Sequence, residues 1–140
     1  MVIDHNEEKF KKKLTPEEYA VLRKGATEPA FTGKYVDAHE SGIFRCKACG
    51  AELFSSDTKF DTNIPGLRGW PSFENAIPDS VQFREDNSLG MHRTEVICTK
   101  CGSHLGHLFD DDSETKTGKH YCINSCALDF KKEERNESHT

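Results

Sequence analysis

Apolar and polar residues follow a helical pattern only near the start of the chain. Residues 1–13 are mostly polar and end in three lysines, a composition typical of a flexible arm. In the segment that follows, Thr15 can cap a helix, Pro16 suits its first position and Glu18 completes a capping box. Gly25 can end the helix, because glycine readily adopts the left-handed conformation of a helix C-terminus. The pattern therefore predicts one short N-terminal helix after a flexible arm.

Beyond this helix the pattern becomes that of strands. Short segments rich in β-branched and aromatic residues alternate with turn residues. The predicted strands are residues 34–37, 43–46, 80–85, 93–98, 104–109 and 120–125. The charged residues 132–140 show no apolar period and are expected to form a flexible tail. We therefore predict a single, mainly β domain over residues 14–131, with antiparallel strands and a short N-terminal helix.

Composition narrows the class of protein. The chain has 140 residues, a length that suits one domain, and its apolar content of 34% is lean, but nine Phe, three Tyr and one Trp supply bulk for a core. No apolar run approaches the roughly 20 residues of a membrane span, and the N-terminus lacks the pattern of a secretory signal. We therefore expect a cytoplasmic protein that does not bind membranes. The net charge of −5 also disfavours a protein that binds nucleic acid.

Four of the six cysteines belong to two copies of the sequence C-x-x-C-G. These are Cys46, Cys49, Cys98 and Cys101. Two intervening residues let one tight turn direct both thiolates at a single ion, and four thiolates complete a closed tetrahedral Zn²⁺ shell. We therefore predict one structural zinc ion per chain. A redox-active pair and an iron–sulfur cluster are the alternatives, but two matched copies followed by glycine favour zinc.

The other two cysteines, Cys122 and Cys126, differ in their surroundings. Cys126 lies in an apolar stretch, which is typical of a thiol packed in a core. Cys122 has polar neighbours and histidines a short way upstream, which favours reactivity. Because the thiolate is the attacking species, Cys122 is our candidate nucleophile.

Polar residues near Cys122 in the sequence could assist such a thiol. His104 and His107 follow the second cysteine pair, and a complete zinc shell would leave them free for acid–base work. One carboxylate of residues 110–112 could orient His107. Asn124 would share a face with Cys122 on a strand, because strand side chains repeat every second residue.

Two aromatic residues, Trp70 and Phe109, could provide an apolar wall for a methyl or thioether group. Together with the thiol and the histidines they indicate a thiol enzyme. The residues alone leave the substrate open, because a Cys–His pair fits acyl transfer and thiol–disulfide chemistry equally well.

Several motifs together resemble the methionine-R-sulfoxide reductases of the B type, in their zinc-containing form. The resemblance covers about residues 14–130, and its motifs are residues 27–33, 69–73, 90–96, 104–109 and 121–125. It implies two antiparallel sheets joined at one end by zinc. It also implies reduction of the R epimer of methionine sulfoxide, chiefly in oxidised proteins under repair. The implied reductant is thioredoxin or another thiol, and we expect a monomer.

The resemblance also assigns roles to individual residues. Cys122 matches the nucleophile, which attacks the sulfoxide sulfur, releases methionine and becomes a sulfenic acid. The residues that match other active-site positions are His104, His107 and Asn124 as polar groups, Asp111 as the supporting acid, and Trp70 and Phe109 around the substrate methyl. His120, in a substrate-binding position, stands where the family usually has arginine.

Two departures from the family pattern carry consequences. No cysteine precedes Gly69 in residues 61–68, where many members have a resolving cysteine. In an extended chain Cys126 would lie roughly 13 Å from Cys122, whereas a disulfide needs about 4.4–6.8 Å between Cα atoms, so an external thiol is the expected reductant. With His120 in place of arginine, the pKa of Cys122 should be less firmly lowered. Activity should then vary with pH between about 6 and 8.

A zinc-stabilised β module that binds a ligand or partner without turnover is the main alternative. Small β folds with two cysteine pairs serve such roles, and a fold does not fix a function. Rapid alkylation of Cys122 at neutral pH would favour the enzyme, because a binding module has no use for a reactive thiol. A zinc ribbon that binds nucleic acid is disfavoured by the acidic charge balance.

Overall fold

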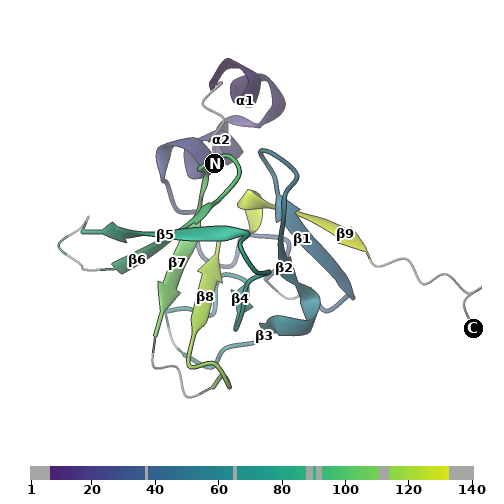
Figure 1. Cartoon of the computed structure of the whole chain (residues 1–140), viewed down its shortest axis with the longest axis vertical. Helices are drawn as coiled ribbons and strands as arrows, with labels where there is room; N and C mark the ends of the chain where they lie inside the picture. The colour runs from purple at the N-terminus through teal and green to yellow at the C-terminus, as the bar shows by residue number, and fades with distance from the viewer. Residues whose placement is uncertain are drawn as a thin grey trace, which may run out of the picture.

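Two antiparallel sheets make up most of the fold in a computed structural model of the chain (Figure 1). The structure describes residues 7–36, 38–64, 66–87, 90, 93–110 and 114–132. The small sheet has the order β2 (Glu52–Ser55), β1 (Gly42–Cys46) and β9 (Leu128–Lys132). The large sheet has the order β3 (Lys59–Phe60), β4 (Ser72–Phe73), β8 (His120–Ile123), β7 (His104–Phe109), β6 (Arg93–Cys98) and β5 (Val81–Asp86). The expected mainly β fold with two antiparallel sheets is confirmed.

The predicted helix is α2 (Pro16–Lys24), and its ends are built as the sequence indicates. The Glu18 N–H donates to Thr15 Oγ1 over 3.1 Å, and the Thr15 N–H donates to Glu18 Oε1 over 2.9 Å. Gly25 ends the helix with a φ of 75°. The capping box and the glycine stop are therefore both present.

A second helix, α1 (Glu7–Lys13), replaces most of the flexible arm expected at the N-terminus. Its Phe10 is only 1% exposed and lies under the guanidinium of Arg23, 4.4 Å from the ring centroid. Arg23 also forms an ion pair with Glu7 at 2.6 Å. These contacts with α2 stabilise a helix that is too short to form alone. Residues 1–6 lie outside the described residues.

Aromatic side chains fill the space between the two sheets. Phe54 of the small sheet stacks on Phe73 of the large sheet, with ring centroids 4.5 Å apart. Phe44 meets Phe73 edge to face at 5.2 Å. All three rings are fully buried, so this cluster forms the centre of the core.

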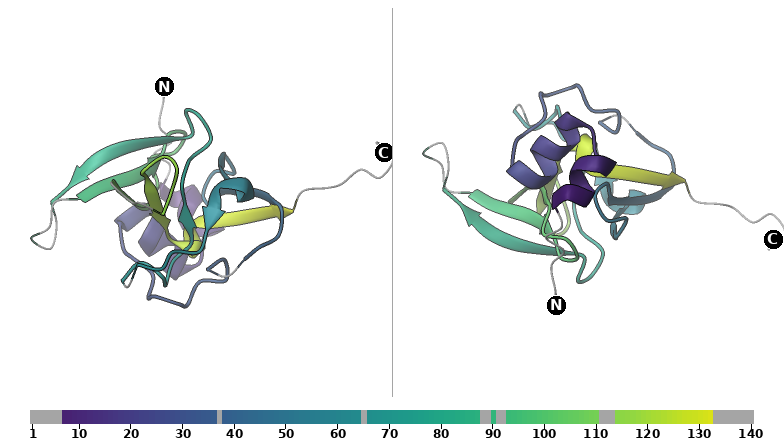
Figure 2. Two further views of the ribbon diagram at one scale, coloured as in Figure 1. Left: turned by 90° about the horizontal axis from the view of Figure 1, so that it is seen from below. Right: turned by 90° about the horizontal axis from the view of Figure 1, so that it is seen from above.

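Both helices lie at one end of the sheets, at the top of Figure 1, and are seen from above in the right-hand view of Figure 2. In the same views β5 and β6 extend away from the rest of the molecule as a long hairpin. Two single turns of 3₁₀-helix complete the described elements, η1 (Ser56–Thr58) and η3 (Ser125–Ala127). Among the described residues, no helix is long and apolar enough to cross a membrane.

One predicted strand is absent and several short strands were not predicted. Residues 34–36 of the expected strand 34–37 form a turn, and residue 37 lies outside the described residues. Tyr35 is buried there against Phe44, with ring centroids 5.4 Å apart, so its aromatic character reflects core packing and not strand pairing. The sequence analysis missed β2, β3, β4 and β9, of which β3 and β4 have two residues each.

Candidate active site and metal centre

The two C-x-x-C-G segments form a cluster of four thiols. Cys46 is the last residue of β1 and Cys98 the last residue of β6. The Sγ–Sγ distance is 3.7 Å between Cys46 and Cys101. It is 3.6 Å between Cys49 and Cys98, and all four sulfurs lie within 4.8 Å of one another. Tetrahedral Zn²⁺ with bonds of about 2.3 Å would separate its sulfur ligands by about 3.8 Å. These four cysteines could therefore bind a metal ion.

The two turns that carry the thiols have the same construction. The Gly50 N–H donates to the carbonyl of Cys46, and the Gly102 N–H donates to the carbonyl of Cys98, each over 2.8 Å. Both glycines have a positive φ, 80° and 75°. A side chain is strained in that conformation, which explains why glycine follows each cysteine pair.

Both helices attach to these turns. The Lys13 ammonium of α1 donates to the carbonyl of Ala48 over 2.9 Å. Arg23 of α2 donates to the carbonyl of Cys101 over 2.7 Å and to Ser103 Oγ over 3.0 Å. The helices and the thiol cluster therefore form one structural unit at the same end of the sheets.

Cys122 lies in β8 and lines a separate cavity of about 240 Å³. Five residues singled out from the sequence meet here: Cys122, His107, Asn124, Trp70 and Phe109. The other lining residues are Thr27, Gly66, Leu67, Arg93 and Gly106. Cys122 stands directly opposite His107 in the antiparallel pair of β8 and β7. Opposed residues of such a pair project from the same face, so the thiol and the imidazole enter the cavity side by side.

A bulge in β7 brings the two histidines of this strand together. His107 pairs with Glu95 and His104 pairs with Ile97, so β7 has one more residue than β6 between these pairs. Residues three apart would point to opposite faces of a regular strand. The extra residue places His104 and His107 on the same face, with ring centroids 5.4 Å apart. His104, however, does not line the cavity.

Gly106, within this bulge, permits the close approach of β8. A Cβ atom at this position would lie 2.1 Å from the carbonyl oxygen of Cys122 and 2.9 Å from the Cα of Ile123. Real Cβ atoms do not tolerate such distances, so only glycine fits between β7 and the nucleophile strand.

Each histidine is held by a carboxylate of the β5–β6 hairpin. His107 Nε2 donates to Asp86 Oδ2 over 2.7 Å, and Arg93 donates to the same oxygen over 3.3 Å. His104 Nδ1 donates to Glu95 Oε2 over 2.6 Å. An ionised carboxylate can only accept, so the proton of neutral His107 lies on Nε2 and its Nδ1 can accept.

The sequence analysis missed these carboxylates and the arginines beside them. It assigned the orientation of His107 to residues 110–112, and Asp111 itself lies outside the described residues. The structure instead places Asp86 in contact with His107. A signal was present, because Asp86 and Arg93 are opposed across one hairpin, as are Arg84 and Glu95. Without the hairpin register, nothing in the sequence connects these pairs to the histidines.

Burial controls the protonation of the groups in this site. Burial lowers the pKa of His107 against the opposing hydrogen bond with Asp86, and the positive charge of Arg93 acts in the same direction as burial. Burial also raises the pKa of Cys122 to about 12, and the carboxylate of Glu28 adds to this effect. The resting site therefore holds a thiol beside a neutral imidazole. This differs from the lowered thiol pKa expected from the sequence, because burial and the Glu28 carboxylate both disfavour the thiolate of Cys122.

Burial does not dominate at Glu95. Burial would raise the pKa of this carboxyl, but hydrogen bonds from His104 and Arg84 lower it to about 2. Glu95 is therefore charged at neutral pH and fixes the orientation of His104.

Asn124 and Trp70 are fixed at the cavity by the backbone of one residue, Glu28. Asn124 Oδ1 accepts from the Glu28 N–H over 3.0 Å, and Asn124 Nδ2 donates to the carbonyl of Leu105 over 3.0 Å. The indole Nε1 of Trp70 donates to the carbonyl of Glu28 over 3.0 Å. Asn124 follows the last residue of β8, yet it lines the cavity with Cys122 as expected.

His120 lies beneath this site and not in the cavity. It is fully buried, shares a 2.7 Å hydrogen bond with Ser72 Oγ and meets Phe60 edge to face at 5.0 Å. It does not line the cavity of Cys122, and its expected role in substrate binding stays a prediction. The pH dependence expected from His120 stays a prediction.

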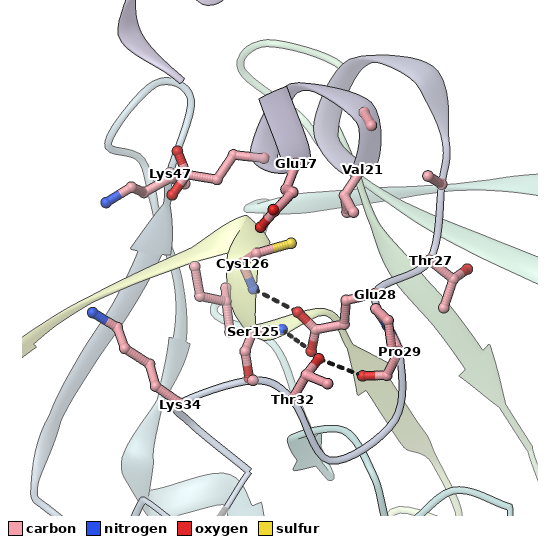
Figure 3. A pocket seen from close by; sticks show the side chains of 15 residues that line it. Glu17, Val21, Thr27, Glu28, Pro29, Thr32, Lys34, Lys47, Ser125 and Cys126 are labelled. Carbon is pink, nitrogen blue, oxygen red and sulfur yellow. Dashed lines mark hydrogen bonds between the residues drawn. The ribbon is translucent and has the colours of Figure 1, made fainter. Parts of the chain in front are cut away.

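Cys126 lies in η3 and lines another, larger cavity of about 720 Å³. Figure 3 shows its thiol between Glu17 of α2 and the Glu28 side chain. The sequence analysis expected a core residue, but Cys126 is only partly buried, and all six cysteines are free thiols. The chain does turn sharply after Asn124, as a disulfide would require, but Cys122 and Cys126 line different cavities.

The fold and site define a mainly β protein with a four-thiol cluster at one end and a cavity that combines a thiol with a histidine. The family model described as "SelR domain" matches residues 14–132. The chain therefore belongs to the SelR domain family.

Curated relatives over nearly the whole chain support the same family and confirm the expected methionine sulfoxide reductase activity. The peptide methionine sulfoxide reductase MsrB of Methanosarcina barkeri is 52% identical over 133 residues, which cover 94% of this chain and 90% of the relative. The protein of the same name from Leifsonia xyli is 50% identical over 94% of this chain and 93% of its own length. The protein of this name from Acinetobacter baumannii is 43% identical over 99% of this chain and 96% of its own length.

One solved structure shows a similar fold at low identity. The crystal structure of the Mis18 "Yippee-like" domain has a TM-score of 0.53 and 17% identity. It covers 69% of this chain and 100% of the Mis18 chain. This likeness concerns the fold alone.

Proposed function

We propose that Cys122 is the nucleophile of this methionine sulfoxide reductase and that the enzyme acts on the R epimer of the sulfoxide. The observation that carries the assignment of residues is the direct pairing of Cys122 with His107 at a cavity lined by Trp70 and Phe109. The aromatic rings would contact the methyl group of the sulfoxide, and the polar side chains of the cavity, His107 and Asn124, would face its oxygen.

The proposed first half-reaction transfers the sulfoxide oxygen to Cys122. The thiol proton moves to Nδ1 of His107 and from there to the sulfoxide oxygen, while the sulfur of Cys122 attacks the sulfoxide sulfur. Cleavage of the sulfur–oxygen bond releases the thioether and leaves a sulfenic acid on Cys122. One thiol and one sulfoxide thus give one sulfenic acid and one thioether, with no net gain or loss of protons.

His107 suits this transfer because it is neutral and its tautomer is set. Asp86 accepts from Nε2, which leaves Nδ1 as the acceptor, and it can stabilise the imidazolium that forms transiently. His104 does not line the cavity, so we assign it a supporting role through its contact with the His107 ring. Asn124 has a second Nδ2 proton that could reach the substrate.

The second half-reaction is proposed to use an external thiol, such as thioredoxin. A first thiol group displaces water from the sulfenic acid and forms a mixed disulfide with Cys122. A second thiol group then restores the Cys122 thiol and leaves an oxidised reductant. The separate cavities of Cys122 and Cys126 support an external thiol over a direct internal one.

The four-thiol cluster is proposed to hold one zinc ion. Zinc bound by Cys46, Cys49, Cys98 and Cys101 would supply a structural cross-link and no open coordination position. The spacing of the four sulfurs supports this assignment.

Epimer-resolved consumption of methionine sulfoxide tests the proposed function. The purified protein is incubated with dithiothreitol and each epimer, and the products are separated by chromatography. Loss of the R epimer alone is expected. Loss of neither epimer, from a folded protein with its metal bound, would instead favour a binding module on this scaffold.

A further inference from the structure

The strongest unassigned group near the site is the carboxylate of Glu28. This side chain is only 7% exposed, and no described cation pairs with it. Its two oxygens accept the backbone N–H groups of η3, from Ser125 over 2.8 Å and from Cys126 over 2.9 Å (Figure 3). Burial of a carboxylate is costly unless hydrogen bonds compensate for the lost water, and here both oxygens receive a backbone N–H.

The backbone of the same residue holds two walls of the Cys122 cavity. Its N–H donates to Asn124 and its carbonyl accepts the indole proton of Trp70, both over 3.0 Å. The carboxylate fixes the turn that begins directly after Asn124. Glu28 therefore forms three hydrogen bonds with the segment that follows β8, residues 124–126, and a fourth with Trp70 of the aromatic wall.

The surroundings leave this carboxylate little freedom. A Cβ atom on Gly33 would lie 2.6 Å from Glu28 Oε2 and 2.2 Å from Ser125 Oγ. The chain thus closes over the carboxylate at Gly33, where no side chain would fit. Glu28 lines the cavity of Cys126, its neighbour Thr27 lines both cavities, and the negative charge of Glu28 raises the pKa of both thiols.

We propose that Glu28 is the positioning residue of the reductase cavity. Its carboxylate anchors residues 27–33 to η3, and the anchored backbone sets the positions of Trp70 and Asn124 relative to Cys122. This inference rests on the proposed function for its catalytic consequence. Its structural content, the placement of Trp70, can be measured without turnover.

The first readout is the fluorescence of Trp70, because the chain contains only one tryptophan. Glu28→Gln keeps the shape of the side chain, but its amide offers one acceptor oxygen to two N–H donors. We expect a red-shifted emission and at least about twofold stronger quenching by acrylamide, because the backbone carbonyl of residue 28, which accepts from the indole, is no longer held in place. Glu17→Gln is the matched control, because Glu17 lines the same larger cavity and is not part of the catalytic cavity.

The second readout compares turnover with thiol reactivity. We expect Glu28→Gln to lower kcat/KM for the R sulfoxide roughly tenfold, as misplaced binding groups do. Alkylation of Cys122, measured in a Cys126→Ser background at about pH 8, should become faster because a neighbouring negative charge is gone. A general loss of structure would not raise the alkylation rate of Cys122 while lowering kcat/KM for the sulfoxide.

Each outcome bears on the assignment. Glu28→Gln with the emission, quenching and kcat/KM of the wild type would overturn it. Should that variant fail to fold, Glu28→Asp keeps the charge but withdraws it by one methylene, and a smaller shift of the Trp70 emission is then expected. Failure of both variants to fold would make Glu28 a stability residue and overturn the assignment too. A wild-type protein without activity would contradict the proposed function and leave the fluorescence test decisive.

Discussion

Single residues in the cavity carry the chemistry, and Cys122 is the one whose removal is most informative. We expect Cys122→Ser to abolish reduction of the R sulfoxide while the melting temperature and metal content stay those of the wild type, because Cys122 is not in the thiol cluster. Turnover with dithiothreitol measures the loss of activity, and thermal unfolding and metal analysis measure the other two quantities. Cys126→Ser is the control and should keep its activity with an external thiol. Full activity of Cys122→Ser would move the nucleophile to another residue.

The partner of His107 offers a second test at the scale of one residue. Asp86→Asn removes the carboxylate that accepts from Nε2 and opposes the lowering of the His107 pKa by burial. The pKa of His107 should therefore fall further, and the acid limb of the pH–rate profile should shift to lower pH. The maximal rate should fall roughly 10- to 100-fold, because the ring loses its orientation. Asp57→Asn, on the exposed η1, is the control, and an unchanged profile for Asp86→Asn would contradict this role.

Among the secondary-structure elements, the β7 bulge brings the catalytic candidates together. Gly106→Ala would place a Cβ atom 2.1 Å from the carbonyl oxygen of Cys122, so β7 and β8 must separate. We expect a loss of about 1–3 kcal/mol in the free energy of unfolding and a marked loss of turnover. Urea unfolding and the sulfoxide assay measure the two effects. Gly118→Ala is the control for backbone strain without a steric clash, because a Cβ atom there meets no neighbour within 4 Å while the φ of 74° disfavours alanine. Equal effects of both substitutions would contradict the steric argument.

Elements differ in how far the sequence predicts them. The capping box of α2 and the two cysteine turns are local, so residues three to five apart determine them. Helix α1 was missed because Phe10 gains its stability from Arg23, a residue in another helix. The acidic partners of His104 and His107 were missed for a similar reason. They come from strands whose register depends on the whole sheet and on a bulge that no local pattern announces.

At the scale of the whole molecule, the thiol cluster joins the two sheets. Cys46 ends β1 of the small sheet and Cys98 ends β6 of the large sheet. Arg23 and Lys13 tie both helices to the same turns. A metal bound here would therefore hold together two strands that are distant in the sequence, with both helices attached to their turns, while the Cys122 cavity lies elsewhere on the large sheet.

Removal of the metal should therefore affect stability before chemistry. Cys46→Ser, or incubation with a chelator, should lower the melting temperature by about 10 °C or more, because a structural zinc ion contributes folding free energy. Turnover should be lost only as the protein unfolds, since no cluster thiol lines the Cys122 cavity. Thermal unfolding, with metal content determined in parallel, measures the effect, and Cys126→Ser is the control. An unchanged melting temperature in Cys46→Ser would show that the cluster does not connect the sheets through a metal.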